Sequence, residues 1–403
     1  SPYVHLPDPS HLVQLHVPAG AGLFVGKSDL SDYYHHLGLP QWMQPYFDAR
    51  VIHGIEIDDF FVFSLNASLA QQVFDRVMAA YRAAGLVVKD SKVVHPTLRP
   101  VKVIGFEFDG RAGTMQLTAE SRVSLLRSTF TALARGQMTG LGLAHLVGRW
   151  TWCMLCRRPS LAVLQHVYRY IQVANRRLFT LWPSVRRELW ILVGLLPLLH
   201  ADLRTPLFGR ILASDASEFC GGVVCAALTP ELRDVVWPLC SSRRHAVLQA
   251  TVRQDSTVRL MNQVEAQPHP DIALLRAASE RYSSFYADVV STRWSTVIST
   301  PWRHVEHINR LELRAALLSL HWLLSYPSSH SSRVFLLVDS MVTYFTLWKG
   351  RSSSAHLLVI LRKISALLLA SRIAMLTGWI PSEVNPADEP SRRVQYQADT
   401  YSP

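Results

Sequence analysis

The stretch Arg333-Val-Phe-Leu-Leu-Val-Asp339 holds an unbroken apolar run, Val334–Val338, with an acidic residue directly after it. A short, continuous apolar run rich in β-branched side chains is typical of a strand that is covered on both faces. The run therefore predicts a buried strand, Arg333–Val338. Asp339 follows directly, at a strand end where a rigid backbone holds a side chain in a fixed position.

Strand and helix patterns alternate around this run, from residue 206 to residue 395. The expected elements are a strand Ile211–Ser214, a returning strand Gly221–Leu228, a helix Leu311–Leu324, a helix Ala355–Ala370 and a strand Arg372–Ile380. Such alternation predicts an α/β domain, a mixed sheet with flanking helices. Residues 229–298 carry scattered charge and many Gln and Ser, and we expect an insertion there. Residues 396–403 are expected to form a loose tail.

Four acidic residues of this region stand at strand ends or helix starts: Asp215, Glu312, Asp339 and Asp388. Each alone has a simpler explanation, as a helix cap or as a charge that complements a helix dipole. Four in one domain favour a metal site. Hydrolysis of a phosphodiester by two Mg²⁺ ions needs several converging carboxylates, because Mg²⁺ prefers oxygen ligands. Mn²⁺ is a possible substitute.

The segments that carry these acids resemble the ribonuclease H domain of retroelements. They are Ser214-Asp215-Ala216-Ser217, His307-Ile308-Asn309 with Leu311-Glu312, Val338-Asp339-Ser340, and Asn385-Pro386-Ala387-Asp388 with Ser391-Arg392. The nearest similarity is to the tyrosine-recombinase retrotransposons (DIRS, Ngaro and VIPER-like elements). The resemblance implies that the four acids bind two Mg²⁺ ions and cleave the RNA of an RNA/DNA hybrid. It also implies substrate contacts from Ser217, Asn309, Arg351 and Ser353.

Two departures from that family are visible. The interval between Asp215 and Glu312 is longer than usual, which agrees with the expected insertion. Many ribonucleases H have a His about ten residues before the last acid, whereas Trp379 and Ile380 occupy that region here. We therefore expect the assisting His to be absent or supplied from elsewhere, with slower turnover as a result.

Residues 1–112 mix short strands with one helix. The expected elements are strands Leu23–Leu30, Val51–Ile57, Phe60–Ser64 and Val101–Phe108, and a helix Leu69–Ala84 that ends at Gly85. The first strand ends on Asp29. Asp58 and Asp59 lie between the second and third strands, at a hairpin turn. A simple acidic turn explains that pair unless its context says otherwise.

The context resembles a reverse transcriptase. Ser28-Asp29-Leu-Ser-Asp32-Tyr-Tyr34 is similar to motif A, and Glu56-Ile-Asp58-Asp59 to motif C, with Glu in place of Tyr. Gly85–Lys92 and Ile104–Phe108 are similar to the two motifs that follow. The resemblance implies catalytic Asp29, Asp58 and Asp59, with Asp29 and Asp58 as Mg²⁺ ligands. It further implies that Tyr34 and Lys92 contact a deoxynucleotide, and that an RNA template and a DNA primer are partners.

The polymerase resemblance has a gap. The interval from Asp29 to Asp58 is too short to hold the motif B helix, so we interpret residues 1–112 as an internally truncated palm. We expect impaired polymerase activity. Three hypotheses follow: a retroelement fragment that cleaves hybrids, an inactive relic that only binds nucleic acid, and an unrelated nuclease of recombinase type.

The composition fits a nucleic-acid partner. Lys and Arg number 41 against 30 Asp and Glu, a net charge of +11 that favours phosphate-rich ligands. Residues 113–205 are expected to be helical, a thumb or connection with paired arginines. The five cysteines indicate a reducing, intracellular setting, nuclear or cytoplasmic, and Cys153 and Cys156 are interpreted as core residues rather than zinc ligands. No signal peptide or membrane span is expected.

Overall fold

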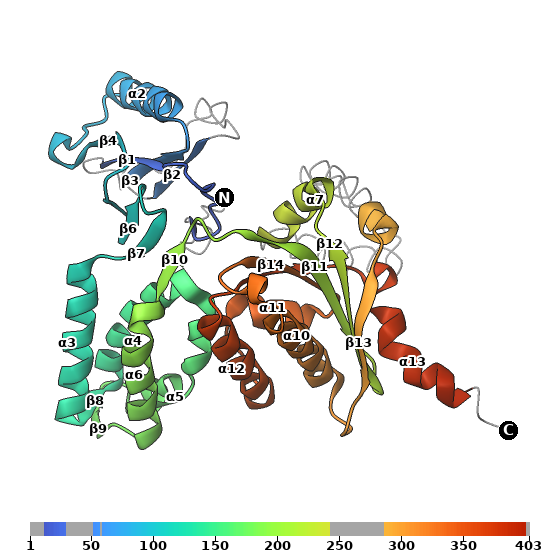
Figure 1. The fold of residues 1–403 in the computed structure, drawn as a ribbon. Helices are drawn as coiled ribbons and strands as arrows, with labels where there is room; N and C mark the ends of the chain where they lie inside the picture. Colours follow the sequence, from blue (N-terminus) through green and yellow to red (C-terminus); the bar gives the residue numbers. More distant parts are fainter. Residues whose placement is uncertain (1–11, 30–50, 57–58, 242–285, 400–403) are drawn as a thin grey trace, which may run out of the picture. The chain divides into compact units, whose positions relative to one another are not determined.

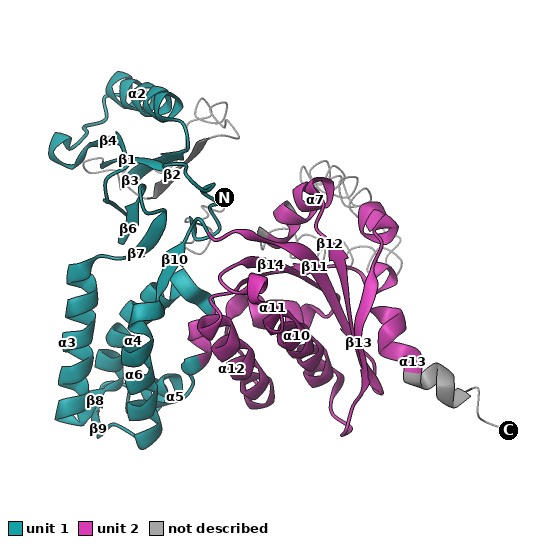
Figure 2. Ribbon diagram, in the orientation of Figure 1, with its two compact units in different colours: residues 1–158, 163–204 teal, residues 159–162, 205–403 magenta. Residues whose placement is uncertain are grey.

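The computed structural model describes residues 12–29, 51–56, 59–241 and 286–399. The chain divides into two compact units, residues 1–158 with 163–204 and residues 159–162 with 205–403 (Figures 1 and 2). Sheets and helices occur in both units, which confirms the mixed α/β fold class. None of the helices in the described part of the chain is both long enough and apolar enough for a membrane span.

The second unit is built on a five-stranded sheet with the strand order β13-β12-β11-β14-β15. The strands are β11 (Leu207–Ala216), β12 (Cys220–Ala227), β13 (Ser295–Pro301), β14 (Arg333–Val338) and β15 (Ala374–Trp379). β14 runs parallel to both β11 and β15, and the remaining pairs are antiparallel, so the sheet is mixed as expected. All six residues of β14 are buried, which confirms the interpretation of the apolar run.

Helices accompany this sheet. They are α7 (Pro230–Ser241), α10 (Ile308–Leu324), α11 (Met341–Lys349), α12 (Ala355–Ala370) and α13 (Asp388–Asp399). Successive side chains of β11 point to opposite faces of the sheet and belong to two different apolar clusters. Leu212 packs with Leu320 of α10 and Ile364 of α12, whereas Ile211 packs with Leu239 of α7. The central strands are therefore covered on both faces.

The range expected to be an insertion contributes to the sheet at one end. α7 lies within residues 229–298, and β13 begins there and pairs along β12 from Cys225↔Ser295 to Cys220↔Pro301. β13 is thus an edge strand of the sheet. Residues 242–285 lie outside the described part of the chain.

The first unit opens with a four-stranded sheet of order β2-β3-β1-β4. Its elements are β1 (Phe24–Asp29), β2 (Val51–Glu56), β3 (Asp59–Ser64), β4 (Val94–Thr97) and the helix α2 (Ala67–Ala83). Asn66 caps α2 by accepting a hydrogen bond from the Leu69 N–H. Phe74 of α2 packs on Phe60 of β3 in a small apolar core. The first three expected strands and the expected helix are confirmed in the described residues, whereas β4 was not predicted.

A second sheet corrects two expectations. It has the order β10-β7-β6-β5, formed by β5 (Val101–Val103), β6 (Phe106–Asp109), β7 (Thr114–Leu117) and β10 (His200–Asp202). The expected single strand Val101–Phe108 is wrong. Ile104 and Gly105 both have positive φ, 49° and 78°, and reverse the chain in a two-residue hairpin between Val103 and Phe106.

Residues 113–205 are not purely helical. The helices α3 (Ala119–Arg135), α4 (Gly140–Met154), α5 (His166–Ala174) and α6 (Pro183–Leu195) are present, but so are β7, β10 and the short pair β8 (Gln137–Thr139) and β9 (Leu178–Thr180). The described residues also include short 3-10 segments: Asp90–Lys92, Leu155–Val163, Leu196–Leu198, Pro327–Ser329 and Ser382–Val384. Three-residue strands were missed because so short a run shows no clear period. Cys153 and Cys156 are free and buried, and burial raises the pKa of Cys153 to about 12.

Candidate metal centre

Asp215 and Asp339 meet because their strands are parallel neighbours. Ser214 of β11 pairs with Val338 of β14. The residues that follow them, Asp215 and Asp339, therefore lie at the same edge of the sheet. Asp215 is 5% exposed and pairs with Gly222 of β12, one residue before the end of β11. The sheet order and register, rather than any closeness in sequence, bring these two carboxylates together.

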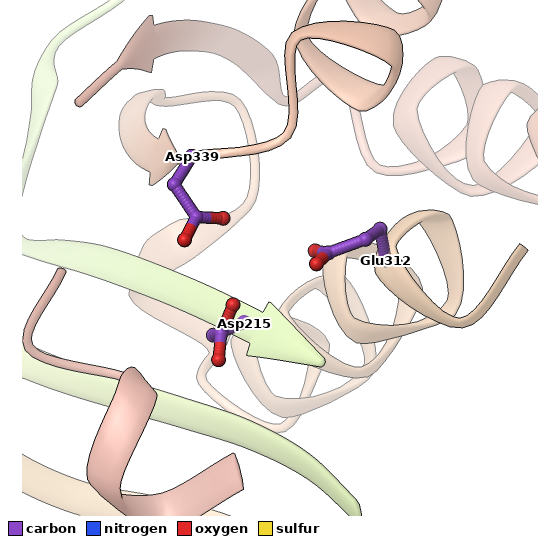
Figure 3. A group of neighbouring side chains, drawn as sticks. All are labelled: Asp215, Glu312 and Asp339. Carbon is purple, nitrogen blue, oxygen red and sulfur yellow. The ribbon is translucent and has the colours of Figure 1, made fainter. Parts of the chain in front are cut away.

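Glu312 approaches the same place from a helix. Leu311 and Ala315 of α10 pack on Ala216 at the end of β11 in a small buried cluster, so the first turn of α10 lies over the strand end. Carboxylate oxygens of Asp215, Glu312 and Asp339 all lie within 4.8 Å of one another. Figure 3 shows the three side chains converging from β11, from α10 and from the end of β14. Three of the four predicted acids therefore form one group.

The pKa values of two carboxyl groups in this site are raised by burial and by mutual repulsion, and a bound cation would relieve that repulsion. Burial, followed by the carboxylates of Asp215 and Asp339, raises the pKa of Glu312 to about 9. Burial and the Asp339 carboxylate likewise raise the pKa of Asp215 to about 6. The backbone N–H of Ala216 acts in the opposite direction on both groups. Buried like charges are unfavourable unless a proton or a cation compensates them.

One oxygen of the Asp339 carboxylate is available as a metal ligand. Its Oδ1 is buried and has no hydrogen-bond partner among the described residues. The backbone beneath it is held, because Trp379 Nε1 donates a 2.6 Å hydrogen bond to the Asp339 carbonyl oxygen. Buried polar atoms are usually satisfied, so an oxygen left over beside two further carboxylates fits a cation. An all-oxygen donor set suits Mg²⁺ or Mn²⁺.

Asp388, the fourth predicted acid, is placed differently. It begins α13 as expected, and its Oδ1 accepts hydrogen bonds from Arg392 Nη2 at 2.7 Å and Nε at 2.9 Å. Its carboxylate is not part of the group of three found among the described residues. It lies near enough to contribute to the raised pKa of Asp215. A role for Asp388 as a fourth ligand stays a prediction.

The residues predicted to contact substrate are found in varied settings. Ser217 forms the turn between β11 and β12, where its Oγ donates to the Ser391 carbonyl at 2.5 Å and accepts from the Cys220 N–H. Asn309 lies in the first turn of α10, next to the cap His307. Arg351 and Ser353 are exposed in the segment between α11 and α12. Their substrate contacts remain predictions.

Ser391 is a neighbour of the site to which sequence reasoning gave no role. Its fully buried Oγ donates a 2.5 Å hydrogen bond to Asp215 Oδ2. Asn385 also reaches the strand, through a 3.3 Å hydrogen bond from Nδ2 to the Ser214 carbonyl. The available signal was the position of Ser391, three residues after Asp388, because residues so spaced share a helix face.

The acids of the first unit are arranged around lysines. Asp29 of β1 pairs in register with Asp59 of β3. The buried Asp29 carboxylate accepts from Lys89 Nζ at 3.0 Å through Oδ1 and from Lys92 Nζ through Oδ2. Burial acts to raise the pKa of Asp29, but the hydrogen bonds from Lys92 and Lys89 prevail and lower it. Lys92, expected near a nucleotide, therefore contacts Asp29, while Asp58 and Tyr34 lie outside the described residues.

Comparisons with known proteins complete the description. No protein-family model matches the chain, and no curated protein does either. Among solved structures, the foamy viral protease-reverse transcriptase in complex with RNA/DNA hybrid is similar over 98% of this chain and 70% of that one, at 12% identity and a TM-score of 0.39. Its dRH form with dsDNA (94% and 60% covered, 10% identity, TM-score 0.38) and the protein with dsDNA (94% and 71%, 12%, 0.36) follow.

Proposed function

We propose that the second unit is a two-metal nuclease of the ribonuclease H type that cleaves the RNA strand of RNA/DNA hybrids. The observation that carries the proposal is the group of Asp215, Glu312 and Asp339, whose carboxylate oxygens lie within 4.8 Å of one another. They come from two adjacent parallel strands and the first turn of a buried helix, which are rigid supports.

The chemistry of the group supports this class of reaction. Bound Mg²⁺ supplies Lewis acidity to the phosphodiester and lowers the pKa of the attacking water. The three carboxylates would hold the metal, and Trp379 and the Ala216 N–H would fix Asp339 and Glu312 in place. The order of the acids and the resemblance of their segments to retroelement ribonucleases H support RNA/DNA hybrid as the substrate.

The parent protein is proposed to be a retrotransposon reverse transcriptase/ribonuclease H, closest to the tyrosine-recombinase elements. The strands around Asp29 and Asp59 would be a remnant of its palm, and the helices of residues 113–205 its thumb or connection. RNA template, DNA primer and deoxynucleotides would be its partners. The lysines on Asp29 support the expectation that polymerase activity is impaired, because each oxygen of that carboxylate already accepts a hydrogen bond from an ammonium group, with which a metal ion would compete.

A cleavage assay tests the nuclease proposal. Labelled RNA annealed to DNA should be cut by the full chain with Mg²⁺ or Mn²⁺, and neither the DNA strand nor free RNA should be cut. Asp339→Asn should abolish cleavage. Asp234→Asn is the matched control, because the same change is made on an exposed side chain of α7 that pairs with its neighbour Arg233. An inert wild-type chain that still binds hybrid would favour the relic hypothesis.

A primer-extension assay tests the polymerase half separately. With an RNA template, a DNA primer and all four deoxynucleotides, we expect no processive synthesis. Processive extension by the full chain would contradict the interpretation of residues 1–112 as a truncated palm, and it would leave the nuclease proposal untouched.

A further inference from the structure

The C-terminal helix α13 reaches the acidic group through a hydroxyl. Ser391 Oγ lies 2.5 Å from Asp215 Oδ2, and the two residues are separated by 176 positions in the chain. Ser391 is fully buried. The Asp388 carboxylate one turn earlier is turned to Arg392 instead. Between Ser391 and Asp388, it is the serine that contacts Asp215 directly.

The Ser391 hydroxyl has two acceptors within reach but only one proton to donate. The second acceptor is the Asp388 carbonyl oxygen, 2.7 Å away. A hydrogen bond to an ionised carboxylate is shorter and about twice as strong as one to a neutral carbonyl. The proton is therefore committed to Asp215 whenever that carboxylate is ionised, which is the form that binds a metal.

This hydrogen bond fixes the direction of the second carboxylate oxygen. With Oδ2 held by α13, the carboxylate is not free to rotate about its bond to the Cβ. Figure 3 shows one Asp215 oxygen on the side where Asp339 and Glu312 lie and the other directed away from them. A ligand oxygen that is already aimed costs less ordering on metal binding than a freely rotating one.

The helix that carries Ser391 is itself closely docked. A Cβ added at Gly222 of β12 would lie 2.7 Å from both the Ala387 carbonyl oxygen and the Ser391 nitrogen, so the strand needs glycine there. Ser299 Oγ of β13 donates a 2.8 Å hydrogen bond to the Pro390 carbonyl. Ser217 Oγ donates to the Ser391 carbonyl. The position of the hydroxyl is thus set by contacts of α13 with β12, with β13 and with the turn between β11 and β12.

We propose that Ser391 is a positioning residue of the metal centre, which orients Asp215 so that a divalent cation is bound by an already aimed oxygen. The proposal rests on the proposed function, because it assumes that the acidic group binds metal. It makes the first turn of α13 part of the site through Ser391, whether or not Asp388 is a ligand.

The test is the affinity of the full chain for Mn²⁺, measured by calorimetry at fixed pH. Loss of an outer hydrogen bond to a metal ligand weakens metal affinity by about 10- to 100-fold, which is the effect expected for Ser391→Ala. Ser391→Cys replaces the hydroxyl by a thiol, which is similar in size but a weaker hydrogen-bond donor. Its Mn²⁺ affinity should lie between those of wild type and Ser391→Ala. Ser329→Ala is the matched control: it removes a 2.7 Å hydrogen bond from an equally buried serine hydroxyl, after the C-terminal end of α10, to the Leu323 carbonyl, and should leave the Mn²⁺ affinity within about twofold.

Hybrid cleavage gives the second readout. Ser391→Ala should need more Mn²⁺ for half-maximal rate, and saturating Mn²⁺ should restore most of the rate, which a general loss of structure would not allow. Equal Mn²⁺ affinity for wild type and both Ser391 variants overturns the positioning role while the metal site stands. Wild-type Mn²⁺ binding that Asp339→Asn leaves unchanged overturns the proposed function, and the positioning role with it.

Discussion

The indole of Trp379 holds the backbone of Asp339: its Nε1 donates a 2.6 Å hydrogen bond to the Asp339 carbonyl oxygen. Trp379 ends β15, the parallel neighbour of β14, and is 5% exposed. It stands in the region where the family resemblance leads one to expect a histidine. In place of a side chain that could act on substrate, the chain has one that fixes a candidate ligand.

Trp379→Phe should therefore weaken the metal centre. An aromatic ring is retained, although a smaller one, but a buried hydrogen bond worth about 1 kcal/mol is lost and the Asp339 carbonyl is left unpaired. We expect lower stability to urea and a several-fold weaker Mn²⁺ affinity. Trp294→Phe is the control, because Trp294 Nε1 donates a similar 2.9 Å bond to the Val289 carbonyl away from the acids. Equal effects of both changes on Mn²⁺ affinity would show that Trp379 is only structural.

Metal binding should release protons near neutral pH. The pKa of Glu312 is raised to about 9 and that of Asp215 to about 6, so at pH 7 Glu312 is largely protonated in the metal-free protein. A cation displaces that proton. Mn²⁺ affinity should therefore increase as the pH rises from 6 to 9. Calorimetry in buffers of different ionisation enthalpy measures the protons released. A heat independent of the buffer at pH 7 is the result that contradicts this expectation.

The stability of the metal-free protein should decrease as the pH rises, whereas its Mn²⁺ affinity increases. Because the folded pKa of Glu312 lies above its unfolded value of 4.5, the folded state binds more protons between the two. Its contribution to stability is therefore fully present below pH 4.5 and decreases as the pH rises towards 9. Glu312→Gln should reduce this loss, and urea unfolding at pH 8 should show the variant to be more stable than wild type. A less stable variant at pH 8 would argue against repulsion in the acidic group.

The Asp29 cluster should show the usual carboxylate behaviour. The hydrogen bonds from Lys92 and Lys89 lower the folded pKa of Asp29, so its contribution to stability is present above the unfolded pKa of about 3.9 and is lost as the pH falls through the folded value. Asp29→Asn should cost about 1.5–3 kcal/mol at pH 7, the range for hydrogen bonds to charged groups. Urea unfolding should show that cost decreasing below pH 4. A cost that is the same at pH 3 and pH 7 would mean that the ion pairs do not stabilise the fold.

Local pattern was sufficient for most elements. The apolar run before Asp339 predicted β14 with its observed bounds, and the helical period predicted α12, Ala355–Ala370, with its observed bounds. Both predictions were possible because the spacing of apolar residues along the chain depends on which faces of an element are buried. The hairpin at Ile104 and Gly105 was missed, because both positions adopt positive φ and only the glycine signals it. The short strands β7 and β10 pair across a long interval of sequence, so no local period marks them.

The sequence by itself determined which acids stand at strand ends and helix starts, since those positions depend on neighbouring residues. Only the tertiary structure decided which of them converge. Asp215 and Asp339 meet through the register of two parallel strands, and Ser391 reaches Asp215 because α13 docks closely on β12. Asp388 turns to Arg392 and Asp29 to two lysines because those partners lie within hydrogen-bonding distance in the folded chain. Such contacts depend on sheet order, packing and side-chain direction, which no local pattern encodes.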